Sequence, residues 1–187
     1  MRIISGNFKG KKILEPFDNE TRPLKDLTKE SIFNILNHSN KFKVEIKDSI
    51  ILDLFSGVGS FGLECLSRGA KHVTFVEKYR RVLPVLKKNL SNLNIDEKYQ
   101  VIENDLFEKS GFNEISDKFD IIFLDPPYKE KKLEILINTI VNENILKKNG
   151  IVIIHRHKKE NDNLTNIFKI IEEKKYGISK IIFGSYF

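Results

Sequence analysis

The residues best suited to chemistry form the tetrapeptide Asp125-Pro126-Pro127-Tyr128, directly after the apolar run 121–124. Each proline fixes its φ at about −65° and lacks a backbone N–H, and each restricts the preceding residue to extended conformations. The loop would therefore hold a carboxylate, an outward-facing carbonyl and an aromatic ring together, which suits a flat substrate that carries an amino nitrogen. The alternative is an ordinary turn that ends a strand.

A glycine-rich segment upstream predicts a nucleotide-binding loop. The stretch 49–55 is predicted to be a buried strand, because it is short, apolar and bounded by polar residues. Gly57, Gly59 and Gly62 follow it with the spacing of the dinucleotide fingerprint. Glycines permit a tight turn and close approach of a ligand, and the N-terminus of the helix predicted next offers unpaired N–H groups. A glycine turn without a ligand is the alternative.

Two acids narrow the choice of ligand. Glu77 ends the predicted strand 72–77, about 20 residues after Gly57, where an acid that binds ribose hydroxyls is expected; the alternative is a solvated glutamate. Asp53 lies inside the otherwise apolar first strand, and burying an unpaired carboxylate is costly. The α-ammonium group of S-adenosylmethionine would supply a partner, and the tetrapeptide has no evident role in hydride transfer. We therefore predict S-adenosylmethionine rather than NAD.

These motifs resemble those of a known class of enzymes. The pattern Asp-x-Phe-x-Gly-x-Gly at 53–59, followed by Asp-Pro-Pro-Tyr at 125–128, is similar to the signature pair of class I methyltransferases that modify exocyclic amino groups. The segments 1–14, 22–36 and 63–70 resemble the RsmD family, and this resemblance covers nearly the whole chain. RsmD proteins are bacterial methyltransferases that act on N2 of one guanine in 16S ribosomal RNA, so the resemblance implies this activity.

The chain departs from the common pattern of that family at three places. Leu24 stands where threonine is common, and Leu27 stands where a basic residue is frequent. The run His155-Arg156-His157 occupies the end of the predicted fifth strand, where an acid is often found. The two signature motifs are not affected.

The resemblance implies a cofactor-binding set and a catalytic set. Asp105 would receive the adenine amino group with the Leu106 N–H nearby, although an acid at a strand end is also an ordinary helix cap. For Arg22, the alternative is an ion pair with Glu20 or Asp26. The predicted cofactor-binding residues are Arg22, Thr28, Asp53, Phe55, Gly57, Gly59, Glu77, Lys78, Asp105 and Leu106. The predicted catalytic residues are Asp125, Pro126, Pro127 and Tyr128.

The expected mechanism follows from the acceptor nitrogen. Its lone pair is delocalised into the guanine ring, so it is a poor nucleophile. Hydrogen bonds from its two N–H groups to the Asp125 carboxylate and the Pro126 carbonyl would hold it pyramidal and free the lone pair. Tyr128 would stack on the base after the base leaves its own stack, and methyl transfer would then need mainly positioning.

The charge of the chain permits an anionic partner. The net charge is +6 and the pI is about 9.2, although lysines occur throughout and part of the excess is a solvated surface. Arg2, Lys9, Lys11 and Lys12 surround a glycine turn that predicts a β-hairpin, and its cations could contact phosphates. A structural flap is the alternative. The resemblance implies 16S rRNA within a small-subunit particle as the partner.

Length and composition predict a single domain over residues 1–187. The resemblance implies that it is a methyltransferase domain, with 1–20 as a basic hairpin extension and 21–187 as the catalytic core. No apolar run approaches the roughly 18 residues of a membrane span, and no export signal is evident. We expect a cytoplasmic monomer without membrane contact. Cys65 is expected to be a packed side chain. The four histidines lack a metal-ligand spacing, so no metal site is expected.

Strands and helices alternate along the sequence, which predicts an α/β fold with helices on both faces of the sheet. The resemblance implies the Rossmann-like class I methyltransferase arrangement: a seven-stranded, mostly parallel sheet with a C-terminal antiparallel hairpin and an N-terminal β-hairpin extension. Strands are expected at 50–55, 72–77, 99–105, 119–125, 151–154, 168–171 and 178–187. Helical patterns separate the first four strands, and in the pattern at 82–93 Pro84 is expected in the first turn. Further helices are expected from Asp26 or Thr28 to about 38 and at 131–141.

Other functions share some of these motifs. The main alternative is an S-adenosylmethionine-dependent amino-methyltransferase acting on adenine N6 in DNA or on a protein glutamine. A nonenzymatic RNA-binding module and an NAD oxidoreductase are more distant alternatives.

Overall fold

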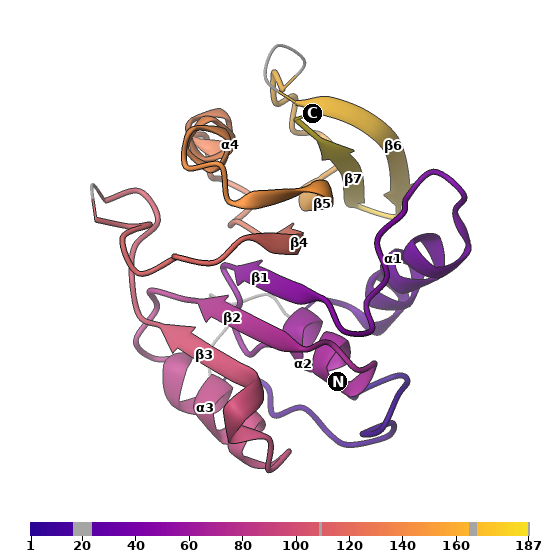
Figure 1. The fold of residues 1–187 in the computed structure, drawn as a ribbon, viewed down its shortest axis with the longest axis vertical. Coiled ribbons are helices and arrows are strands. Elements are labelled where there is room, and N and C mark those ends of the chain that lie inside the picture. The colour runs from indigo at the N-terminus through magenta and orange to yellow at the C-terminus, as the bar shows by residue number, and fades with distance from the viewer. Residues whose placement is uncertain (17–23, 109, 165–167, 187) are drawn as a thin grey trace.

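The chain folds around a mixed β-sheet (Figure 1), as seen in a computed structural model that describes residues 1–16, 24–108, 110–164 and 168–186. Within these residues the sheet has seven strands in the order β3-β2-β1-β4-β5-β7-β6. The four strands β1 to β4 are parallel to one another and to β5, whereas β7 is antiparallel to both β5 and β6. The strands are β1 (Ile50–Leu54), β2 (His72–Val76), β3 (Tyr99–Ile102), β4 (Phe119–Leu124), β5 (Leu146–His157), β6 (Lys169–Tyr176) and β7 (Ser179–Ser185). The predicted parallel sheet with a terminal antiparallel hairpin is confirmed.

Helices cover both faces of the sheet, as predicted. Figure 1 shows α1 (Asp26–His38), α2 (Ser60–Ser67) and α3 (Leu83–Ser91) on one side and α4 (Leu133–Asn142) on the other. The first face is packed by a stack of three rings, with centroid distances of 5.3 Å between Phe33 and Phe61 and 4.1 Å between Phe61 and Phe123. Burial on both faces explains why β1 and β4 are almost continuously apolar.

Some element boundaries differ from the predictions. Neither Asp26 nor Thr28 caps α1, because the helix begins at Asp26 after the N-cap residue Lys25. The described residues between β3 and β4 form turns instead of a helix. In this segment a Cβ on Gly111 would lie 2.6 Å from the carbonyl oxygen of Asp105, which shows how tightly the chain folds back there. Pro84 does lie in the first turn of α3.

The N-terminal segment forms only part of the predicted β-hairpin. The chain folds back so that the Ile3 N–H donates to the Lys11 carbonyl at 2.9 Å, but only an isolated bridge joins Arg2 to Lys12 among the described residues. Its turn packs against α2 (Figure 1), where the Phe8 N–H donates to Ser67 Oγ at 2.9 Å. Across the described residues, none of the helices is long and apolar enough to cross a membrane.

Candidate active site

The candidate active site lies where β1, β2 and β4 end. In the sheet Leu54 pairs with both Val76 and Leu124, so the residues that follow these strands lie side by side. Glu77 and Asp125 are such residues, and Asp53 lies one position before the end of the central strand. The topology thus brings together three carboxylates that are distant in the sequence. Parallel α/β sheets bind their ligands at this carboxyl edge.

Asp53 is the most buried of the three acids, with 1% of its surface exposed. Its Oδ2 accepts a hydrogen bond of 3.0 Å from the Gly62 N–H in the first turn of α2. Burial raises the pKa of Asp53 well above its usual value, the bond from Gly62 opposes this rise, and the charges of Asp125 and Glu77 add to it. Among the described residues no cation forms an ion pair with Asp53, so a bound cationic group would find an uncompensated acid here.

The glycine loop is held to Glu77 through its backbone. The Gly57 N–H and the Tyr79 N–H donate to the two oxygens of the Glu77 carboxylate, each at 2.8 Å. Gly59 adopts a left-handed φ of 84°. A Cβ on Gly62 would lie 2.2 Å from the ring of Phe75, so this glycine lets α2 pack closely on β2. The predicted loop and the predicted acid are therefore brought together.

The residues predicted for the adenine end are also close to one another. Lys78 Nζ lies 2.9 Å from Asp105 Oδ2, and the Phe107 N–H donates to Asp105 Oδ1 at 3.0 Å. Partial burial alone would raise the pKa of Asp105, but these bonds and the nearby lysine charges lower it below its usual value. Leu106 is buried, and the Phe55 ring lies 5.9 Å from that of Phe107. Asp105 thus caps a turn, rather than the helix considered as an alternative.

The loop 125–130, called the acceptor loop below, has a supporting residue that the sequence interpretation missed. His155, interpreted as a simple strand end, has Nδ1 2.7 Å from Asp125 Oδ1 and Nε2 2.9 Å from Ser179 Oγ. The Tyr128 ring meets the rings of His155 and His157 edge-on, with centroid distances of 5.9 Å and 5.2 Å. The one signal in the sequence was the departure from the family pattern at position 155. It indicated a difference at this strand end but did not identify Asp125 as the partner of His155.

Arg156 is a second residue that was missed. It is a buried cation, with 1% of its surface exposed, and its guanidinium lies 2.8 Å and 3.0 Å from the two oxygens of Asp162. It also donates to the Glu130 carbonyl at 2.9 Å and to the Pro127 carbonyl at 3.4 Å. Arg156 therefore ties the loop after β4 to the segment after β5.

The turn of the predicted basic cluster lies at the opposite end of α2 from these acids. It packs at the C-terminal end of α2, and Lys11 Nζ donates to the carbonyl of Asn92, which follows α3. Both contacts are at the amino edge of the sheet, opposite Asp125. Of the N-terminal residues predicted to bind nucleic acid, Lys9 and Lys11 thus lie away from the carboxylate site. Arg2, which pairs with Lys12, lies nearer to the glycine loop, because its carbonyl accepts from Lys29 Nζ at 2.7 Å, and this nitrogen lies 3.4 Å from Ser60 Oγ at the start of α2.

Two further cofactor candidates have different outcomes. Thr28 is buried in α1 beside Lys29, whose Nζ lies 3.4 Å from Ser60 Oγ at the start of α2. Its role in cofactor binding stays a prediction. Arg22 lies outside the described residues.

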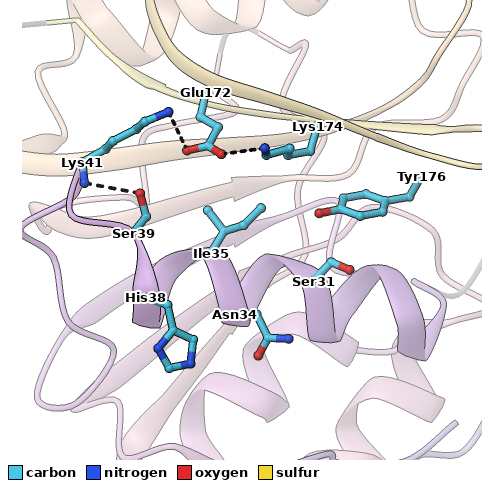
Figure 2. A pocket seen from close by; sticks show the side chains of 9 residues that line it. All are labelled: Ser31, Asn34, Ile35, His38, Ser39, Lys41, Glu172, Lys174 and Tyr176. Atoms are coloured by element: carbon cyan, nitrogen blue, oxygen red, sulfur yellow. Dashed lines mark hydrogen bonds and ion pairs between the residues drawn. The ribbon is translucent and has the colours of Figure 1, made fainter.

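A hollow of about 610 Å³ between α1 and β6 contains none of the predicted site residues (Figure 2). Its α1 wall carries Ser31, Asn34 and His38. On the β6 side Glu172 pairs with Lys41 at 3.2 Å and with Lys174 at 3.3 Å, so two lysines share one glutamate.

Comparison with known proteins identifies the family. A family model described as Conserved hypothetical protein 95 matches residues 1–185. The chain belongs to this family. A member from Haemophilus influenzae, "Ribosomal RNA small subunit methyltransferase D", is 34% identical over 179 residues, which cover 95% of this chain and 90% of that protein. The RsmD resemblance is thereby confirmed.

Solved structures confirm the fold class. The structure titled "Putative methyltransferase yhhF from Escherichia coli" is 27% identical to this chain and has a TM-score of 0.80. The match covers 100% of this chain and 97% of that chain. A putative methyltransferase complexed with SAH, SMU.776, has a TM-score of 0.66 at 18% identity and covers 83% of this chain and 48% of its own. The latter likeness concerns the fold alone. The fold is the predicted Rossmann-like methyltransferase fold.

Proposed function

We propose that the protein is an rRNA methyltransferase that transfers a methyl group from S-adenosylmethionine to N2 of a guanine in 16S rRNA. The observation that carries this proposal is the placement of Asp53 and Glu77 beside Asp125 at three neighbouring strand ends. It sets two acids suited to a cationic nucleoside next to a loop suited to an amino group. The relative from Haemophilus influenzae, named as a small-subunit rRNA methyltransferase, supports the same substrate class.

The residues present fit S-adenosylmethionine. Asp53 would face the α-ammonium group, Glu77 would accept from the ribose hydroxyls, and Asp105 with the Leu106 N–H would contact adenine. The uncompensated burial of Asp53 gives a cationic ligand a clear electrostatic advantage, because an isolated buried carboxylate is costly. The SAH bound to a protein of the same fold is consistent with this choice.

Asp125 is the centre of the proposed mechanism. One oxygen of its carboxylate faces His155, and the other would accept a hydrogen bond from the guanine amino group, as would the Pro126 carbonyl. Tyr128, framed by two histidine rings, would stack on the flipped base. S-adenosylmethionine would supply a methyl group on a positively charged sulfur, which would keep the electron pair of the sulfur–carbon bond when N2 takes the methyl group. Asp125 would take the proton that N2 then loses.

Exposed lysines near Tyr128 would contact the rRNA close to the target base. They lie on the two loops that Arg156 joins, and they are Lys129, Lys131, Lys132, Lys158 and Lys159. The N-terminal basic cluster, at the amino edge, would contact rRNA further from the reacting guanine. We propose that the enzyme acts as a monomer on a small-subunit particle, whose extended surface can reach both regions.

A labelled-methyl assay tests this function. Small-subunit particles, naked 16S rRNA, DNA and protein would each be offered separately with labelled S-adenosylmethionine. We expect label in rRNA, above all in the particle, and none in DNA. Asp117, an exposed acid in the loop before β4, is a suitable control: Asp117→Ala should keep wild-type transfer. Label in DNA or protein alone would contradict the proposal.

A further inference from the structure

We propose that His155, held by Ser179, is a positioning residue that fixes the Asp125 carboxylate for the incoming amino group. This inference rests on the proposed function, because it assigns a role within the same site. It concerns side chains from three neighbouring strands, since Asp125 follows β4, His155 lies in β5 and Ser179 begins β7.

The geometry connects the three side chains in one chain of hydrogen bonds. His155 Nδ1 lies 2.7 Å from Asp125 Oδ1, and Nε2 lies 2.9 Å from Ser179 Oγ. The His155 and Ser179 residues are each 6% exposed, whereas the Asp125 side chain is 19% exposed. The buried end of this chain is therefore fixed by packing, and its open end is the carboxylate that would meet the substrate.

The direction of each hydrogen bond follows from the groups involved. An ionised carboxylate can only accept, so the Nδ1 of His155 carries the proton and donates to Asp125. In a neutral imidazole the other nitrogen is then an acceptor, and the Ser179 hydroxyl donates to Nε2. The Asp125 carboxylate thus selects the tautomer of His155, as a hydrogen bond to one ring nitrogen does in general. The Ser179 hydroxyl, which can donate or accept, adapts to this tautomer and holds the ring through Nε2.

His155 acts on both functional parts of the acceptor loop. Its bond engages Oδ1 of Asp125 and leaves Oδ2 to accept from the guanine amino group. Its ring also meets the Tyr128 ring edge-on at 5.9 Å, which limits how that ring can tilt. One buried side chain therefore sets the carboxylate and the stacking surface relative to each other, and a small misplacement of reacting groups can cost about 100-fold in rate.

Three variants test the role by steady-state kinetics. His155→Leu removes the donor at similar bulk, and we expect kcat to fall about 100-fold while the affinity for S-adenosylmethionine, measured by calorimetry, stays within about twofold. His155→Asn keeps an N–H near the Nδ1 position and should recover at least tenfold of the loss. Ser179→Ala should lower kcat less than His155→Leu. Equal losses in the Leu and Asn variants would indicate a packing role and overturn the inference.

A second measurement does not depend on activity. Nitrogen-15 spectra of histidine-labelled protein, assigned with His155→Asn, should show a protonated Nδ1 and an unprotonated Nε2 in His155, and Ser179→Ala should shift the Nε2 signal. An unprotonated Nδ1 would overturn the inference. If the wild type methylates another acceptor, the proposed function fails, whereas wild-type guanine methylation with an unchanged kcat in His155→Leu would contradict this inference alone.

Discussion

The two halves of the site are positioned in different ways. In the cofactor half, backbone N–H groups hold the acids: Gly62 donates to Asp53, and Gly57 and Tyr79 donate to Glu77. In the acceptor half, two side chains hold the loop 125–130: His155, which is itself held by Ser179, and Arg156. The cofactor half should therefore tolerate many side-chain changes around its glycines, whereas the acceptor half should depend on individual side chains of β5 and β7.

Removal of the Arg156 side chain should have the largest effect on the acceptor half. Arg156→Ala leaves the Asp162 carboxylate unpaired and frees the loop after β4. Breaking a buried ion pair from one side costs about 3–5 kcal/mol of stability, which chemical denaturation would measure. At a temperature where the variant is still folded, we expect kcat to fall by about 100-fold with nearly unchanged affinity for S-adenosylmethionine. Arg156→Lys is the matched variant, because it keeps the positive charge but cannot bond to Asp162 and Glu130 together as the guanidinium does. A parallel loss of cofactor affinity would show that the halves are not separate.

Asp53→Asn should give the opposite pattern. Loss of the charge should weaken S-adenosylmethionine binding about 10- to 100-fold, as expected for a hydrogen bond to a charged group, with a smaller change in kcat at saturating cofactor. Calorimetric titration would measure this affinity. Wild-type affinity in the variant would remove Asp53 from the cofactor site.

The same substitution should change how the stability of the ligand-free protein depends on pH. Burial raises the pKa of Asp53 in the folded state, so the folded protein binds the proton more tightly than the unfolded chain does. The free energy of unfolding should then decrease as pH rises from the usual aspartate range through the raised pKa. Asp53→Asn should lose this decrease. The melting temperature of the variant minus that of the wild type should therefore be larger at pH 8 than at pH 5. An equal gain at both pH values would contradict the buried-acid interpretation.

The smallest expected effects concern the basic surfaces. Replacing Lys131 and Lys158, which lie on the loops beside Tyr128, by glutamate should raise KM for the particle several-fold. It should also reduce the dependence of binding on salt, by about one unit of slope for each lysine that no longer meets a phosphate. Lys9→Glu with Lys12→Glu is the matched pair at the amino edge, and we expect a smaller rise in KM. A larger effect from the amino-edge pair would place the main rRNA-binding surface there.

The cofactor half could be predicted from the sequence because Asp53, the glycine loop and Glu77 follow one motif of fixed spacing. The bond from Gly62 to Asp53 spans nine residues and that from Gly57 to Glu77 spans 20, so motif spacing determines the geometry. The bonds of His155 to Asp125 and Ser179 span 30 and 24 residues across separate strands. They depend on the register of β4, β5 and β7, which spacing alone does not determine.

The fold itself was largely predictable, with local exceptions. The alternation of apolar strands and helical patterns predicts the parallel sheet, and the short connection at Tyr176-Gly177 predicts the terminal antiparallel hairpin. The turns before β4 were missed because a helical pattern there competes with the close packing of Gly111 on Asp105. The N-terminal hairpin was overestimated, because its residues bond to Glu64 and Ser67 of α2 as well as to each other, and only one isolated bridge forms between its two arms among the described residues.

The most direct test of the account is to identify the methylated nucleoside. Wild-type protein and Asp125→Ala would be incubated with labelled S-adenosylmethionine and small-subunit particles, and the rRNA would be digested to nucleosides for mass spectrometry. We predict labelled N2-methylguanosine at a single position with the wild type. With Asp125→Ala we predict at least a 100-fold lower yield, although calorimetry should show that the variant binds S-adenosylmethionine. Label on another nucleoside, or undiminished transfer by Asp125→Ala, would contradict the account.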